Sequence, residues 1–189
     1  MSNFSFNLND EEKKYLKELV TWSLLYYFER GGNPASREVP APPENSPLRQ
    51  ELGAFVTLTE DGELRGCIGQ IVGHGPLYLA VAQMAQAAAF QDSRFPPVQA
   101  DELDLLDFEI SVMGPIELCP HWEKIEIGKH GLIIKNGQHQ GLLLPQVASD
   151  RNWSREVFLE NLCRKAGLEA SQWEDNSSQI YWFECVIVK

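Results

Sequence analysis

The uncharged apolar segment from Leu77 to Phe90 constrains the fold most, because it is long enough for a helix and carries no charged side chain. Gly75 and Pro76 precede it, and proline suits the first position of a helix. Apolar side chains would lie on nearly every side of such a helix, which favours burial rather than a surface position. Its run of alanines also favours close packing of the neighbouring elements. We therefore expect a central, buried helix.

A second helix is predicted near the N-terminus, with Asn9 as N-cap, Glu12 completing a capping box and an end at Gly31 after about Arg30. Its broad apolar stripe suits the covering of a sheet. Five prolines between residues 33 and 50 exclude a helix or a central strand there. A loop of this length is either a surface excursion or a cover over a functional cleft.

The order hairpin, helix, strand occurs twice in the remaining sequence. The first copy comprises a hairpin of residues 54–59 and 64–71, the apolar helix, and a strand of residues 107–113. The second comprises a hairpin of residues 131–135 and 141–147 around Asn136-Gly137, a helix from about residue 154 to residue 167, and a strand of residues 180–188. Two differing copies indicate an old duplication, and they predict an α+β fold with a mostly antiparallel sheet and an added N-terminal helix.

The composition narrows the functional classes. The 189 residues carry a formal net charge of -11, which argues against a general nucleic-acid binder and against attachment to an anionic membrane surface. No signal peptide and no apolar run approaching ~20 residues is visible, so a cytoplasmic location is expected. The four cysteines lie far apart without a C-x-x-C pair, which favours free thiols in a reducing compartment.

The string Leu64-Arg65-Gly66-Cys67-Ile68-Gly69 is the most chemically specific part of the sequence. Side-chain alternation in a strand places Arg65 and Cys67 on the same face. An arginine beside a thiol favours the thiolate, which attacks electrophiles, and the glycines at 66 and 69 would let a substrate or another backbone approach. Cys67 is therefore the candidate nucleophile, with Arg65 as its activator; a small buried structural cysteine is the alternative.

Other polar residues are candidates for assisting roles. His130 and Glu109 are candidate bases, Arg94 could bind a substrate carboxylate or phosphate, and Gln146 could carry an amide to the site. For Glu109 and Arg94 the alternative is a structural salt bridge. A metal site built from Cys67 and Cys119 with the histidines at 74 and 121 has little support from the spacing, and no phosphate-binding glycine pattern occurs, so neither a metal nor another cofactor is predicted.

The string around Cys67 resembles the signature of the AMMECR-one domain family, to which the AmmeMemoRadiSam system protein A belongs. The resemblance continues through residues 53–58, 92–97, 108–112, 130–132, 141–147 and 162–168. It implies a single domain of two closely packed lobes, about residues 1–115 and 116–189, with the Cys67 string lining a cleft between them. It also implies a shared pathway or complex with a Memo-type protein and a radical S-adenosylmethionine (SAM) protein.

Two functions follow from these observations. The first is a cytosolic enzyme that uses Cys67 on a small metabolite or a modified macromolecule. The second is a non-catalytic module that binds a ligand or a protein partner, with Cys67 in a structural role. The reaction, the substrate and the oligomeric state are not specified by the sequence.

Overall fold

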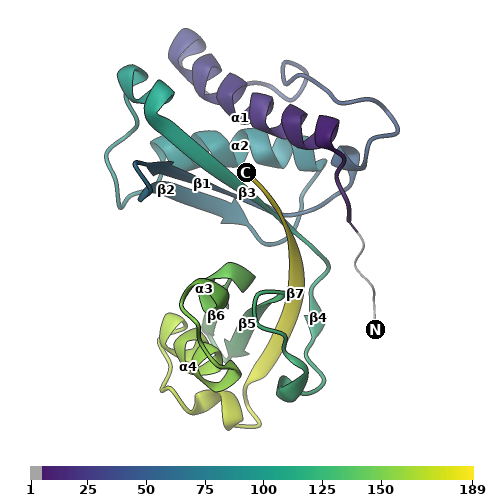
Figure 1. The fold of residues 1–189 in the computed structure, drawn as a ribbon, viewed down its shortest axis with the longest axis vertical. Coiled ribbons are helices and arrows are strands. Elements are labelled where there is room, and N and C mark those ends of the chain that lie inside the picture. The colour runs from purple at the N-terminus through teal and green to yellow at the C-terminus, as the bar shows by residue number, and fades with distance from the viewer. Residues whose placement is uncertain (1–5) are drawn as a thin grey trace. The chain divides into compact units, whose positions relative to one another are not determined.

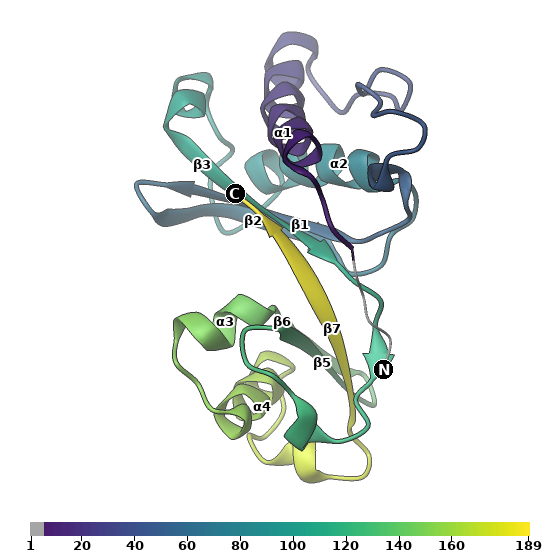
Figure 2. The same cartoon turned by 45° about the vertical axis from the view of Figure 1, so that its right-hand side comes forward.

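The computed structural model describes residues 6–189, and these divide into two compact units. The larger unit contains residues 6–113 together with Val186–Lys189, and the smaller unit contains Gly114–Cys185. Figures 1 and 2 show both units. Each unit is built from helices and antiparallel strands, which confirms the predicted α+β class.

The sheet of the larger unit contains β1 (Ala54–Glu60), β2 (Glu63–Gln70) and β3 (Leu106–Met113) in the order β2-β1-β3. Both pairings are antiparallel, with β1 in the centre and β2 at an edge. On one face of the sheet the side chains of Val56, Leu58 and Ile110 are fully buried. This alternation is the predicted pattern of a sheet with one face in a core.

The helix α2 (Leu77–Phe90) packs against β1 and β2 on one side and against α1 (Asp10–Arg30) on the other. Figure 1 shows the resulting layers, with α2 between α1 and the sheet. The predicted central, buried helix is therefore confirmed. Pro76 is the N-cap residue rather than the first helical residue, a difference of one position. The capping box of α1, made by Asn9 and Glu12, is present as predicted.

The smaller unit contains the strands β4 (Glu117–Leu118), β5 (His130–Asn136) and β6 (His139–Leu143), and β7 (Gln179–Val188) begins in it. The order is β7-β5-β6, and β4 pairs with β7. The helix α4 (Arg155–Lys165) contacts β5 and β6, and its side chains Phe158, Leu159 and Leu162 are fully buried. The remaining elements are the short helix α3 (Pro145–Asp150) and the 3-10 turns η1 (Pro47–Arg49), η2 (Ala100–Leu105), η3 (Trp122–Lys124) and η4 (Gln172–Glu174).

The prediction of a strand through residues 141–147 is wrong beyond Leu143. Pro145 begins α3, at the first helical position, so Gln146 lies on a helix and not on the predicted strand. The physical reason is the fixed backbone angle of proline, which suits the first turn of a helix, where its missing N–H leaves no hydrogen bond unmade. The apolar residues before Pro145 made the segment resemble a continuous strand.

The two copies of hairpin, helix and strand have the same internal arrangement. The strand order β2-β1-β3 of the larger unit corresponds to β6-β5-β7 of the smaller one. In each copy a glycine of the hairpin's second strand lies against the helix: a Cβ atom on Gly66 would come within 2.2 Å of the Ala88 carbonyl oxygen, and one on Gly141 within 2.9 Å of the Leu162 carbonyl oxygen. These glycines align the two copies residue by residue.

Among the described residues, no helix combines the length and the apolar character that crossing a membrane requires.

The contact between Gly66 and α2 predicts a large cost for adding a single methyl group. Gly66→Ala should lower the free energy of unfolding by about 3 kcal/mol, because the new Cβ would meet backbone atoms of α2 that cannot rotate away. Urea unfolding measures this change. The control is Leu64→Ala on the same strand, where the side chain is 41% exposed and a loss of about 1 kcal/mol or less is expected. Equal losses for the two variants would contradict the close packing.

Candidate functional site

Cys67 lies on the edge strand β2, on the face of the sheet that does not carry α2. Its neighbour Gly66 faces α2, and side chains alternate along a strand. The pairing register places Thr57 of β1 between Cys67 and Glu109 of β3. These three residues form a polar row across the sheet, which we call the Cys67 row.

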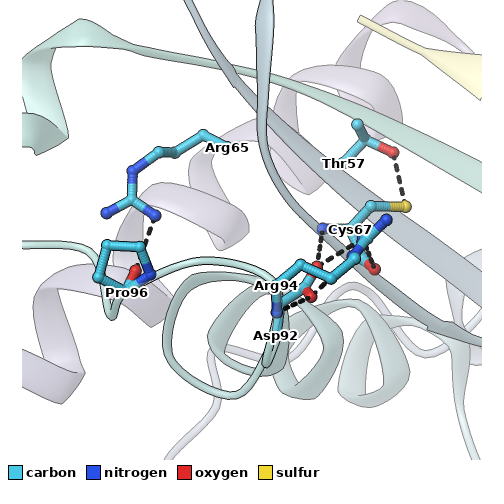
Figure 3. Close-up of polar contacts among 6 residues, drawn as sticks. All are labelled: Thr57, Arg65, Cys67, Asp92, Arg94 and Pro96. Carbon is cyan, nitrogen blue, oxygen red and sulfur yellow. Dashed lines mark hydrogen bonds and ion pairs between the residues drawn. The ribbon is translucent and has the colours of Figure 1, made fainter.

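Thr57 is the direct partner of the thiol. Its hydroxyl donates a hydrogen bond to the Cys67 sulfur, with 3.2 Å between Oγ1 and Sγ (Figure 3). Both side chains are half-buried. The sequence prediction missed Thr57. A symmetric pairing around the turn would place Thr57 opposite Gly66, and the register shift between Leu58 and Thr59 places it opposite Cys67 instead.

The backbone of Cys67 is held by two side chains from the loop that follows α2. Its N–H donates to Oδ2 of Asp92 at 2.9 Å, and its carbonyl oxygen accepts from Nη2 of Arg94 at 3.2 Å (Figure 3). An edge strand leaves such groups without a neighbouring strand. Asp92 and Arg94 therefore take the place of a neighbouring strand at this residue.

Asp92 and Arg94 are themselves joined by three hydrogen bonds. The guanidinium donates from Nε to Oδ1 at 2.9 Å and from Nη2 to Oδ2 at 2.6 Å, and the Arg94 backbone N–H donates to Oδ1 at 3.2 Å. The Asp92 side chain is only 4% exposed, whereas that of Arg94 is 54% exposed. The hydrogen bonds from Arg94, together with that from the Cys67 amide, hold the pKa of Asp92 well below its usual range despite its burial. These hydrogen bonds thus stabilise the ionised form of Asp92. The sequence prediction did not single out this residue.

Arg65 does not contact the thiol. Its guanidinium donates to both carboxylate oxygens of Glu102, at 2.7 and 3.0 Å, and to the carbonyl oxygen of Pro96 at 2.8 Å. The hydrogen bonds from Arg65 lower the pKa of Glu102. Figure 3 shows Arg65 directed to Pro96 and away from the sulfur. The guanidinium beside Cys67 belongs to Arg94, whose pKa is raised chiefly by Asp92 and to a smaller degree by Cys67.

Glu109 completes the Cys67 row. Its carboxylate forms an ion pair with Nζ of Lys189 at 3.0 Å, and its side chain is 22% exposed. The structure thus brings Glu109 onto the face that carries Cys67, in register with Thr57. Its predicted role as a base stays a prediction.

Two other predicted residues belong to the smaller unit. His130 is buried; its Nδ1 accepts from the Glu126 amide at 3.0 Å, and its ring packs on Trp182 with 4.5 Å between centroids. Burial lowers the pKa of His130, which favours the neutral ring. Gln146 lies in the first turn of α3. Roles for either at the Cys67 site stay predictions.

The two glycines of the Cys67 string make room for protein atoms. Gly66 admits the backbone of α2, and a Cβ on Gly69 would come within 2.2 Å of the Phe55 ring. Their proposed contact with a substrate stays a prediction. The four cysteines carry free thiols, and residues 6–189 contain no group of three or more histidine, cysteine, aspartate or glutamate side chains that could hold a metal ion.

The smaller unit shows which residues this architecture needs at the Cys67 row. Aligned through Gly66 and Gly141, the row corresponds to Leu142, Ile133 and Tyr181. A largely apolar row therefore supports the same strand order. The thiol, hydroxyl and carboxylate of the Cys67 row are not required by the arrangement of strands, which favours a functional reason for them.

Comparison with known proteins gives a consistent result. The family model described as AMMECR1 matches residues 19–188. The chain belongs to the AMMECR1 family. Protein NEQ441 of Nanoarchaeum equitans is 44% identical over 144 residues, which cover 72% of this chain and 80% of that protein. Protein TK0174 of Thermococcus kodakarensis is 38% identical over 194 aligned positions, covering 96% and 92%.

A solved AMMECR1 relative supports the fold. The crystal structure of PH0010 from Pyrococcus horikoshii, titled an uncharacterized protein, matches with a TM-score of 0.85 and 36% identity. The match covers 96% of this chain and 93% of that one. The resemblance seen in the sequence is thus confirmed at the level of family and fold.

The paired, buried carboxylate of Asp92 predicts a pH-dependent contribution to stability. Asp92→Asn should lower the free energy of unfolding at pH 7 by about 2 to 3 kcal/mol, because the ion pair with Arg94 is lost. The folded-state pKa of Asp92 lies below the unfolded value of about 3.9, so its contribution is present above that pH and is lost as the pH falls. The difference between wild type and variant should therefore shrink below about pH 4.

Urea unfolding at a series of pH values measures this difference. Asp104→Asn is the matched control, since Asp104 is exposed on η2, and a change within about 0.5 kcal/mol is expected. A difference between Asp92→Asn and wild type that persists unchanged at low pH would contradict a role for the Asp92 charge.

Proposed function

We propose that this AMMECR1 chain is a cysteine-dependent enzyme in which the Cys67 thiolate attacks an electrophilic carbon. The substrate is a small metabolite or a modified macromolecule. The observation that carries the proposal is the hydrogen bond from the Thr57 hydroxyl to the Cys67 sulfur. A donor aimed at sulfur stabilises the thiolate, which is the nucleophilic form of cysteine.

The surrounding groups supply the remaining roles. Arg94 places a positive charge near the thiolate, and its Nη1 has no partner among the described residues, so it is available for a substrate carboxylate or phosphate. Glu109 is the proposed proton acceptor, since it shares the face and the register of Thr57. Its carboxylate is 3.0 Å from Nζ of Lys189.

The proposed step conserves atoms and charge. The Cys67 thiol proton passes to Glu109, with the Thr57 hydroxyl placed between them as a donor and acceptor. The sulfur lone pair forms the S–C bond, and one electron pair of the C=O or C=N double bond moves to its oxygen or nitrogen. That atom then takes the proton from Glu109.

A second candidate is a binding or adaptor module in which Cys67 is structural. The observation that favours it is the satisfaction of the groups around Cys67. Its N–H and carbonyl oxygen are both bonded by the Asp92–Arg94 pair, and the charges of Arg65 and Glu109 are already balanced by Glu102 and Lys189. Under this alternative, no covalent product forms on the thiol.

The proposal places the protein in the cytoplasm, where reducing conditions keep thiols free. It also adopts the pathway partners implied by the family resemblance, a Memo-type protein and a radical SAM protein. Those partners would supply or consume the substrate.

Alkylation of the native protein by iodoacetamide tests the thiol directly. Mass spectrometry at each cysteine gives the rates at pH 7, and Cys67 should react faster than Cys119 and Cys185, which are also half-buried. Thr57→Val should slow the reaction at Cys67 by about tenfold, because it removes a hydrogen bond to a charged sulfur worth about 1.4 kcal/mol.

Thr59→Val is the matched control, because Thr59 lies two residues away on the same face of β1 and pairs with Leu64 instead of Cys67. Its rate should stay within about twofold of wild type, a difference of under about 0.5 kcal/mol. A Cys67 that reacts only after unfolding, or that reacts equally in Thr57→Val, would support the structural alternative.

A further inference from the structure

The smaller unit contains a groove that the Cys67 site does not use. Among the residues that line it are Leu118, Cys119, Trp122, Glu123, Trp173 and Ile180. We call it the Trp groove. Burial raises the pKa of the Cys119 thiol, so this cysteine is suited to packing and not to attack on an electrophile.

Two tryptophans give the groove a rigid apolar surface. Trp122 comes from η3 and Trp173 from η4, and their rings meet edge to face with 5.3 Å between centroids. Both are partly buried and pack against the core of the smaller unit. Tryptophans that are anchored in this way and still line a groove are typical anchors of a binding surface, because little conformational entropy is lost when they are covered.

An edge strand borders the Trp groove. β4 pairs with β7, and the described residues, 6–189, include no second pairing of β4. Leu118 on this strand is 58% exposed, although it is a large apolar side chain. Prolines at 115 and 120 limit any added strand to about three residues. A short extended segment fits such an edge.

One carboxylate lines the groove, and three more lie within two residues of its lining residues in the sequence. Glu117 precedes Leu118, Glu123 lines the groove, and Glu174 and Asp175 follow Trp173. None of the four forms an ion pair with a cation of the described chain. Lys124 is the one lysine or arginine adjacent in sequence to these residues, which leaves an excess of negative charge. This excess favours a cationic partner.

We propose that the Trp groove binds a short extended peptide segment of a partner protein. The segment carries a bulky apolar side chain that packs on Trp122 and Trp173, and flanking lysines or arginines that meet the carboxylates. Backbone hydrogen bonds to β4 fix its direction. A carbohydrate would also stack on tryptophan, but it would use neither the strand edge nor the acidic rim. The proposal does not depend on the chemistry of Cys67.

Selection from a phage library of random 12-residue peptides on the full-length protein tests the proposal. The expected consensus is an aromatic or large aliphatic residue flanked by Lys or Arg. Fluorescence polarisation with a selected synthetic peptide should give at least tenfold weaker binding to Leu118→Ser and to Glu123→Lys. These side chains are exposed or on the rim, and thermal unfolding verifies that both variants fold.

Matched control variants distinguish binding in the groove from nonspecific binding. Leu105→Ser removes a leucine of similar exposure, 59%, from the larger unit, and Glu63→Lys makes the same charge change at an exposed residue there. Both should bind the peptide within twofold of wild type. The proposal is overturned if no peptide is enriched, if enriched peptides lack basic residues, if all four variants bind alike, or if a glycan array binds where peptides do not.

Discussion

The architecture around Cys67 depends on the hydrogen bonds that the buried Asp92 carboxylate accepts. It accepts the Cys67 amide on β2 and the guanidinium of Arg94, and so joins the end of α2 to the edge of the sheet. A buried carboxylate that lost these donors would be strongly destabilising. The loop after α2 is consequently fixed at one end by Asp92 and farther along by Arg65, which holds Pro96 and Glu102.

The hydrogen bonds from Asp92 and Arg94 to the backbone also explain how Cys67 can be held in place without using its thiol. Asp92 and Arg94 bind the backbone of Cys67, and the Cys67 side chain contacts Thr57 instead. The backbone amide of Cys67 points away from β1, so Cys67 and Thr57 form the closely spaced type of cross-strand pair, in which side chains meet. The backbone of Cys67 thus fixes the position of the residue, and its sulfur remains for the proposed reaction.

Most of the fold could be predicted from local patterns, and much of the site could not. The uncharged segment of α2 required burial, and the Asn9 capping box is a local signal. The role given to Arg65 rested on side-chain alternation alone, and alternation cannot show that Glu102, 37 residues later, binds the guanidinium. A regular hairpin register would pair Thr57 with Gly66, so the register shift after Leu58 hid its contact with Cys67, and Asp92 needed the path of the loop. The strand predicted through residue 147 was wrong because the apolar residues before Pro145 continue the strand pattern, whereas Pro145 starts a helix.

We propose that the Cys67 row serves chemistry and not stability. The smaller unit supports this claim, since Leu142, Ile133 and Tyr181 occupy the corresponding row. Equilibrium unfolding of the double variant Thr57→Val with Cys67→Ala tests it most directly. The account predicts a free energy of unfolding within about 1 kcal/mol of wild type, as expected for half-buried side chains of similar size. A loss of about 3 kcal/mol or more would contradict it and show that the row is part of the core.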